Sequence, residues 1–264
     1  MTGHAPERMP APMTLALPRP DLRSLSWLAV FATILGAWVV MFMMARMAGV
    51  DAIGRPVGMA MMPMDRFGTL FAMWAIMMAA MMLPTMVPTL ATYDRLIRSA
   101  DGTRAGWCGV LLGYALAWTC FAAAIALAQI GLLRLGWIDA LGAATSGLLT
   151  AALLIGVGLY QFSRTKAVCH ARCHAPLTFF LGHWRTGFAG GLSMGLRLGG
   201  FCVLCCWGFM ALGFVGGTMS LLWMGAATLF MVCEKLPELG NRLIRPAGAL
   251  LIASGVGTAL STVI

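Results

Sequence analysis

Three cysteines fall within five residues of a long apolar segment: Cys202, Cys205 and Cys206. No charged residue occurs between Leu198 and Cys233, so this region is predicted to be helical and buried in lipid. The i,i+3 and i,i+4 spacings place the three thiols on one helical face. Thiolates bind soft ions such as copper(I) and zinc. We interpret this face as a soft-metal site, and the alternative is that the cysteines act as small apolar packing residues.

A second group of candidate ligands lies in the predicted cytoplasmic loop between the fourth and fifth apolar segments. It consists of Cys169, His170, Cys173 and His174. On a helix the two thiols form one i,i+4 pair and the two imidazoles another. Zinc and copper both accept mixed Cys/His shells, and cytoplasmic thiols stay reduced. These four residues are therefore candidate metal ligands, although a solvated loop also uses such residues without function.

Methionine is the third source of soft ligands, with 22 residues in the chain. Met77 and Met81 form an i,i+4 pair in the second apolar segment, where Pro84 and Pro88 are predicted to open the helix. Thioether selects copper(I), whereas methionine inside a membrane span also serves as an apolar filler. A predicted outer loop adds Met59, Met61, Met62 and Met64. Soft ligands on both sides and within the span would suit a soft cation that is passed across a bilayer.

Two charged residues are candidate partners of this chemistry. Arg197 lies inside the fifth predicted span, where a charge is costly and usually faces a cavity or a partner. Glu234 lies near the inner end of the sixth predicted span. We expect Arg197 to neutralise bound thiolates, a carboxylate such as that of Glu234, or an anion in transit, and the alternative is that its side chain snorkels to the inner membrane surface.

The composition indicates a membrane protein with an all-α fold. The chain has 264 residues, of which 60% are hydrophobic and 10% charged, against about a quarter charged in soluble domains. Residues 1–24 are predicted to be a disordered tail and residues 25–264 a single polytopic membrane helical bundle. Seven membrane-spanning helices are expected, at residues 25–47, 67–90, 106–133, 141–162, 187–214, 218–236 and 246–263.

The positive charges predict the orientation of the bundle. With seven spans, thirteen of the eighteen lysine and arginine residues fall on the side of the N-terminus, which is therefore predicted to be inside. The net charge of +9 then reflects topology and not nucleic-acid binding. The expected location is the bacterial inner membrane, and the expected partners are the lipid bilayer and a metal chaperone or another membrane protein. Gly187, Gly191, Gly195 and Gly199 recur every fourth residue and predict close approach of a neighbouring helix.

Several separated motifs resemble a bacterial family of unknown function that is catalogued as predicted metal-binding integral membrane proteins. The matching segments include Met73-Trp74-x-x-Met77, Lys166-x-x-Cys169-x-x-x-Cys173, Met194-Gly195-Leu196-Arg197, Cys202-x-x-Cys205-Cys206-Trp207 and Glu234-Lys235. The resemblance implies a membrane protein with metal ligands. The chain departs from the family pattern at Leu198, where a histidine is common, and at His170, where a leucine is common. The departures weaken His170 as a shared ligand and favour Cys169, Cys173, Cys202, Cys205, Cys206 and Arg197.

The favoured function is binding of a soft metal, copper(I) before zinc, for transport or handling. The first alternative is a membrane thiol–disulfide oxidoreductase, in which the loop thiols would have to reach about 20 Å into the membrane to meet Cys202. The second is a non-catalytic assembly factor in which the cysteines only pack. No nucleophile elbow, phosphate loop or intramembrane carboxylate pair indicates a hydrolase or kinase, so the sequence favours a protein that is not an enzyme.

Overall fold

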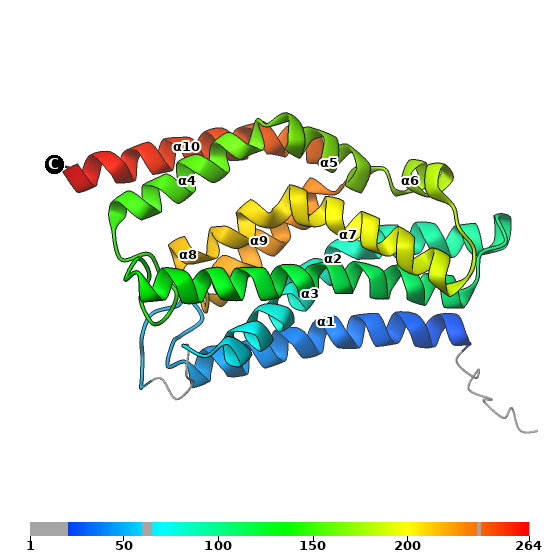
Figure 1. Cartoon of the computed structure of the whole chain (residues 1–264), viewed down its shortest axis with the longest axis horizontal. Helices are drawn as coiled ribbons and strands as arrows, with labels where there is room; N and C mark the ends of the chain where they lie inside the picture. Colours follow the sequence, from blue (N-terminus) through cyan, green and yellow to red (C-terminus); the bar gives the residue numbers. More distant parts are fainter. Residues whose placement is uncertain (1–20, 60–64, 237–238, 264) are drawn as a thin grey trace, which may run out of the picture.

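The computed structural model of the chain describes residues 21–59, 65–236 and 239–263, and the regular elements within these ranges are all helices (Figure 1). This confirms the predicted all-α class. Most of the predicted tail lies outside the described residues. The helices are α1 (Leu22–Met47), α2 (Phe67–Ser99), α3 (Arg104–Arg134), α4 (Gly147–Gln161), α5 (Arg164–His174), α6 (Pro176–His183), α7 (Gly187–Ala211), α8 (Gly213–Gly216), α9 (Leu221–Glu234) and α10 (Gly240–Val263).

The number of helices that could cross a membrane differs from the predicted seven. Within the described ranges, five are long and apolar enough: α1, α2, α3, α7 together with α8, and α10. A sixth span results if α4 and α5, which are bent by 63° relative to each other, are taken together. The helix α9 has 14 residues and therefore reaches about 21 Å, less than the roughly 30 Å of a hydrocarbon core. The apolar composition of residues 218–236 did not predict that the helix in this range would be only 14 residues long.

The helices α3 and α7 form the centre of the bundle, with α1 on one side, α10 packed along α4 on the other, and α2 crossing behind α3 (Figure 1). A side chain at Gly195 would collide with the backbone carbonyl of Val110, and one at Gly113 with that of Leu192. The two backbones therefore touch where both helices carry glycine, which confirms the predicted close approach. Cys202, three residues beyond Gly199, lies at the end of this contact, where its Sγ is 3.1 Å from the Tyr114 hydroxyl of α3.

The helix α2 stays continuous through Pro84, although the sequence predicts that it opens there. Proline has no N–H, so the carbonyl of Ala80 loses its partner within the helix. The indole of Trp38 in α1 donates to that carbonyl at 3.1 Å and replaces the missing bond. The helix therefore continues through the next residue, Thr85, whose side chain is buried in the bundle.

The predicted fourth-to-fifth loop folds into the two helices α5 and α6. Ser163, two residues after the end of α4, caps α5, since its hydroxyl accepts from the backbone N–H of Lys166 at 3.1 Å. Pro176 occupies the first turn of α6, a position where its missing N–H has no cost. The bend at Ser163 turns α5 back onto α7. Residues predicted to lie in a cytoplasmic loop therefore pack against the mid-chain cysteines.

Candidate metal centre

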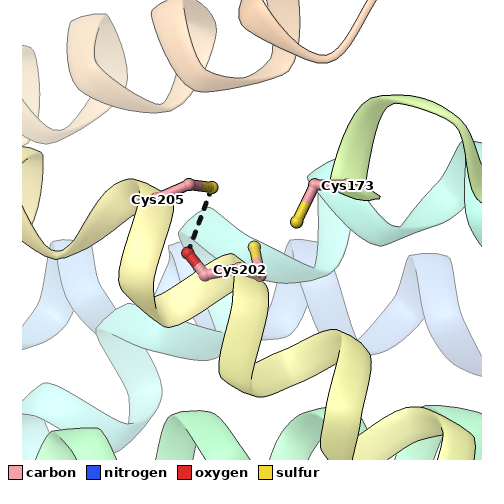
Figure 2. Close-up of side chains that lie close together, drawn as sticks. All are labelled: Cys173, Cys202 and Cys205. Carbon is pink, nitrogen blue, oxygen red and sulfur yellow. Dashed lines mark hydrogen bonds between the residues drawn. The ribbon is translucent and has the colours of Figure 1, made fainter. Parts of the chain in front are cut away.

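Three cysteines from two helices meet in the interior of the bundle. Cys173 of α5 and Cys202 and Cys205 of α7 have Sγ atoms that all lie within 4.8 Å of one another (Figure 2). Their exposed fractions are 5%, 0% and 3%. A planar metal site with three metal–sulfur bonds of about 2.3 Å needs sulfurs about 4.0 Å apart. Small side-chain adjustments would bring this thiol cluster (Cys173, Cys202 and Cys205) to that geometry.

Cys206 lies beside the thiol cluster. Its Sγ is 3.2 Å from the Sγ of Cys205, and both residues are free thiols. The thiol of Cys205 donates to the backbone carbonyl of Cys202 at 3.3 Å, the dashed line in Figure 2. The structure therefore groups all three predicted α7 cysteines, with Cys206 adjoining the three sulfurs that could share one ion.

Polar groups from three other segments surround the sulfur of Cys202. The ammonium of Lys235, just after α9, lies 3.0 Å from this Sγ and donates to the Thr85 hydroxyl, also at 3.0 Å. The phenol of Tyr114 in α3 lies 3.1 Å from the same Sγ. A positive charge at this distance offsets part of the negative charge of a metal held by thiolates, and the low dielectric of the interior strengthens the effect.

A buried ion pair joins the elements that carry the thiol cluster. Lys166 of α5 lies 2.6 Å from the carboxylate of Glu234 at the end of α9, and both side chains are at most 2% exposed. The same ammonium donates to the backbone carbonyl of Cys205 at 2.7 Å. Lys166 thus connects α5, α7 and α9 at one point.

Glu234 is therefore not the partner of Arg197, which the sequence suggested. Arg197 is exposed on the outer surface of α7 and lines an open cavity together with Cys120 of α3. Arg197 is not part of the thiol cluster, whose three cysteines are at most 5% exposed. The position of an arginine within an apolar segment does not predict whether its side chain faces the bundle interior or the outer surface.

The four predicted ligands of the former loop are separated by the fold. Cys173 joins the α7 thiols, whereas Cys169 is buried outside the group. The Nε2 of His170 donates to the backbone carbonyl of Glu234 at 2.9 Å. The ring of His174 lies 5.1 Å from that of His170. Within the described ranges, the thiol cluster is the group of cysteine, histidine or carboxylate side chains that is close enough to share an ion.

The predicted methionine ligands lie elsewhere. Met77 and Met81 of α2 are buried, at 1% and 0% exposure. Met77 lines a separate small cavity together with four other methionines. In the predicted outer loop, Met59 is 91% exposed. Met61, Met62 and Met64 lie outside the described residues.

Sequence reasoning missed three contacts of Cys202: Thr85, Tyr114 and Lys235. The positive-charge distribution predicts that Lys166 and Lys235 lie at the cytoplasmic surface of the membrane and set topology alone. The resemblance of the Glu234-Lys235 and Lys166-x-x-Cys169 segments to the family pattern was the available signal for both lysines. Tyr114 and Thr85 lie in apolar helices in which no pattern marked them.

A family model described as PpoB2, copper chaperone, matches residues 71–258. Searches of curated proteins and of solved structures gave no significant match. The matched range runs from α2 into α10 and contains the thiol cluster, Cys206, Lys166 and Lys235. It covers well over half of the chain, and a copper-handling family agrees with a centre built from buried thiols. The chain therefore belongs to the PpoB2 copper chaperone family.

Proposed function

We propose that this protein is an integral membrane copper chaperone that holds copper(I) in the thiol cluster. The observation that carries the proposal is the meeting of Cys173 with Cys202 and Cys205, whose sulfurs lie within 4.8 Å of one another although they come from two helices. Family membership supports copper as the cargo. The ion would be received and passed on to a copper-requiring partner protein.

Copper(I) suits the donor set better than zinc. Both ions accept thiolates, but structural zinc sites are almost always four-coordinate. The thiol cluster offers three sulfurs, with no carboxylate or imidazole in the group. Lys235 supplies a compensating positive charge 3.0 Å from one of them. A monovalent ion with three sulfur ligands is therefore the favoured occupant.

A membrane location is part of the proposal. The long helices carry large apolar side chains on their outer faces, such as Leu28 and Leu35 of α1 and Leu250 of α10, each more than 60% exposed. Water would oppose so much exposed apolar surface, whereas lipid would cover it. We place the protein in the bacterial inner membrane with its N-terminus inside, as the distribution of positive charges predicts.

The oxidoreductase alternative gains one supporting observation. The sequence predicted a gap of about 20 Å between Cys173 and Cys202, and the bend at Ser163 removes it. However, exchange requires the sulfur of an external dithiol or disulfide partner to contact the attacked sulfur directly. The thiol cluster is at most 5% exposed, which disfavours such contact. A bare ion needs a much smaller opening.

The test compares copper content in matched cysteine variants. Wild type, the triple variant Cys173→Ser/Cys202→Ser/Cys205→Ser and the control Cys108→Ser/Cys120→Ser would be purified under anaerobic, reducing conditions. The control cysteines lie on α3 and are exposed. Each protein would be titrated with copper(I) against a chromophoric copper(I) chelator, and bound copper would be counted by mass spectrometry.

We expect the triple variant to bind one copper(I) fewer per chain than wild type, and the α3 control to bind the same number as wild type. Equal copper in the triple variant and wild type would overturn the proposal and leave the cysteines a packing role, as in an assembly factor. A reversible Cys173–Cys202 or Cys173–Cys205 disulfide in a wild type that binds no copper would instead favour the oxidoreductase.

A further inference from the structure

A small cavity lined by methionine lies at the end of the bundle where α1 ends and α2 begins. Its lining includes Met41 and Met44 of α1, Met73 and Met77 of α2, and Met219 between α8 and α9. All five side chains are less than 9% exposed. The cavity volume is about 10 Å³. We call this space, with its five methionines, the methionine cavity.

The methionine cavity has the size of one small ion but not the chemistry of a water site. A buried water occupies about 10–15 Å³ and makes two to four hydrogen bonds. Apart from the methionines, the lining side chains are Leu221 and Thr218. The hydroxyl of Thr218 already donates to the backbone carbonyl of Leu141 at 3.0 Å. The Thr218 hydroxyl could still accept one hydrogen bond, which is fewer than the two to four that a buried water makes, whereas a soft ion would find several thioether sulfurs.

We infer that the methionine cavity is a second copper(I) site, separate from the thiol cluster. The inference rests on the proposed function, which makes copper(I) the cargo. Thioethers are neutral, soft ligands that select copper(I), and the flexible methionine side chain can move its sulfur onto an ion without backbone change. The ligands come from three segments of the chain, so an ion could be enclosed on all sides.

The helix α2 links the two sites. Met77, Met81 and Thr85 follow one another at i,i+4 spacing, so they lie on one face of the helix. Met81 is fully buried, and Thr85 bonds to the Lys235 ammonium that contacts Cys202. The distance from Met77 to Thr85 along the helix is about 12 Å. A buried thioether thus lies between the methionine cavity and the thiol cluster.

The predicted orientation places the methionine cavity toward the outer side of the membrane, because α1 runs outward from an inside N-terminus. Thiols on that side become oxidised, whereas thioethers form no disulfides. A thioether site at the outer end would therefore resist oxidation, and a thiol site deeper in the bundle would be shielded from it.

The test counts copper(I) per chain when the methionine cavity is altered. Met73→Leu/Met77→Leu keeps the side-chain volume nearly constant and removes two sulfurs from the lining. The matched control is Met43→Leu/Met47→Leu, which changes two exposed methionines on α1. Both pairs would be made in wild type and in the Cys173→Ser/Cys202→Ser/Cys205→Ser background, and titrated with copper(I) against the chelator.

We expect the Met73→Leu/Met77→Leu change to remove one copper(I) per chain in each background, and the control to remove none. Unchanged copper after the Met73→Leu/Met77→Leu change in both backgrounds would overturn the second site. Failure of the proposed function gives a different result: the triple cysteine variant would then bind as much copper as wild type.

A second measurement covers the case in which the double variant folds poorly. Wild type with ¹³C-labelled methionine methyl groups would be titrated with silver(I), which is a soft monovalent ion and is stable in air. The single variants Met73→Leu and Met77→Leu assign two of the signals. Those two signals should shift with silver(I), whereas the Met43 and Met47 signals should not. Unmoved cavity signals at saturating silver(I) would contradict the site.

Discussion

The thiol cluster and the methionine cavity are both buried and lined by sulfur, yet their surroundings differ in charge. Lys235 contacts a cysteine of the thiol cluster, and the Lys166–Glu234 pair adjoins it. The described residues that line the methionine cavity include no charged side chain. Thiolates bring negative charge into a medium of low dielectric and need compensation, whereas thioethers are neutral. The two regions thus show how the ligand type determines which residues a buried metal site requires.

The two regions also differ in how the chain assembles them. The thiol cluster depends on the bend at Ser163, because α5 must turn back to bring Cys173 to α7. The methionine cavity uses residues near the end of α1 and the beginning of α2, together with the segment between α8 and α9. Changes at the α5–α7 contact should therefore affect the thiol cluster alone.

The largest effect is expected when Cys173 is replaced. Cys173→Ser should strongly weaken copper(I) binding at the thiol cluster, because the two α7 sulfurs of the cluster remain without the third ligand. Cys169→Ser, one turn away on the same helix, should leave binding intact because Cys169 lies outside the group. Chelator competition on single and double variants checks this. If Cys169→Ser costs as much copper as Cys173→Ser, the ligand assignment on α5 is wrong.

Zinc in large excess should distinguish the two sites. Zinc accepts thiolates, while thioethers are soft ligands that favour copper(I). We expect zinc(II) to compete with copper(I) at the thiol cluster and to leave copper(I) in the methionine cavity. Titration of the copper-loaded protein with zinc, followed by counting of both metals, gives the answer. Displacement of all copper by zinc would show that both sites use thiolates.

The Lys166–Glu234 pair should contribute strongly to stability. Glu234→Gln leaves the Lys166 ammonium buried without its charge partner, which costs about 3–5 kcal/mol for pairs of this kind. Arg197→Gln should change stability little because Arg197 is exposed. Thermal unfolding of both variants in detergent tests the difference. A similar decrease in unfolding temperature in the two variants would show that Arg197 also contributes to stability.

The smallest effect concerns Lys235. Lys235→Leu removes the positive charge 3.0 Å from Cys202 and should weaken copper(I) binding at the thiol cluster by about tenfold, equivalent to 1.4 kcal/mol. Binding in the methionine cavity should not change. Lys235→Arg should retain most of the affinity. Equal weakening at both sites would indicate a general disturbance of the bundle in place of a local electrostatic effect.

Much of the fold could be predicted from the sequence. Apolar composition predicts where the long helices lie, and glycine spacing predicts which helix face packs closely against a neighbour. The α7 cysteine face and its burial followed from i,i+3 and i,i+4 spacing. The position of Cys173 could not be predicted, because a cap at Ser163 looks the same whether the next helix turns toward solvent or toward the core. The pairing of Glu234 with Lys166, in place of Arg197, depends likewise on the direction in which each helix faces.

The most direct test of the thiol cluster is copper X-ray absorption on the Met73→Leu/Met77→Leu variant loaded with one copper(I) per chain. We expect three sulfur neighbours at about 2.3 Å. Adding Cys173→Ser should reduce the sulfur count or release the ion. A first shell containing nitrogen, as His170 or His174 would supply, or a spectrum unaffected by Cys173→Ser, would contradict the account.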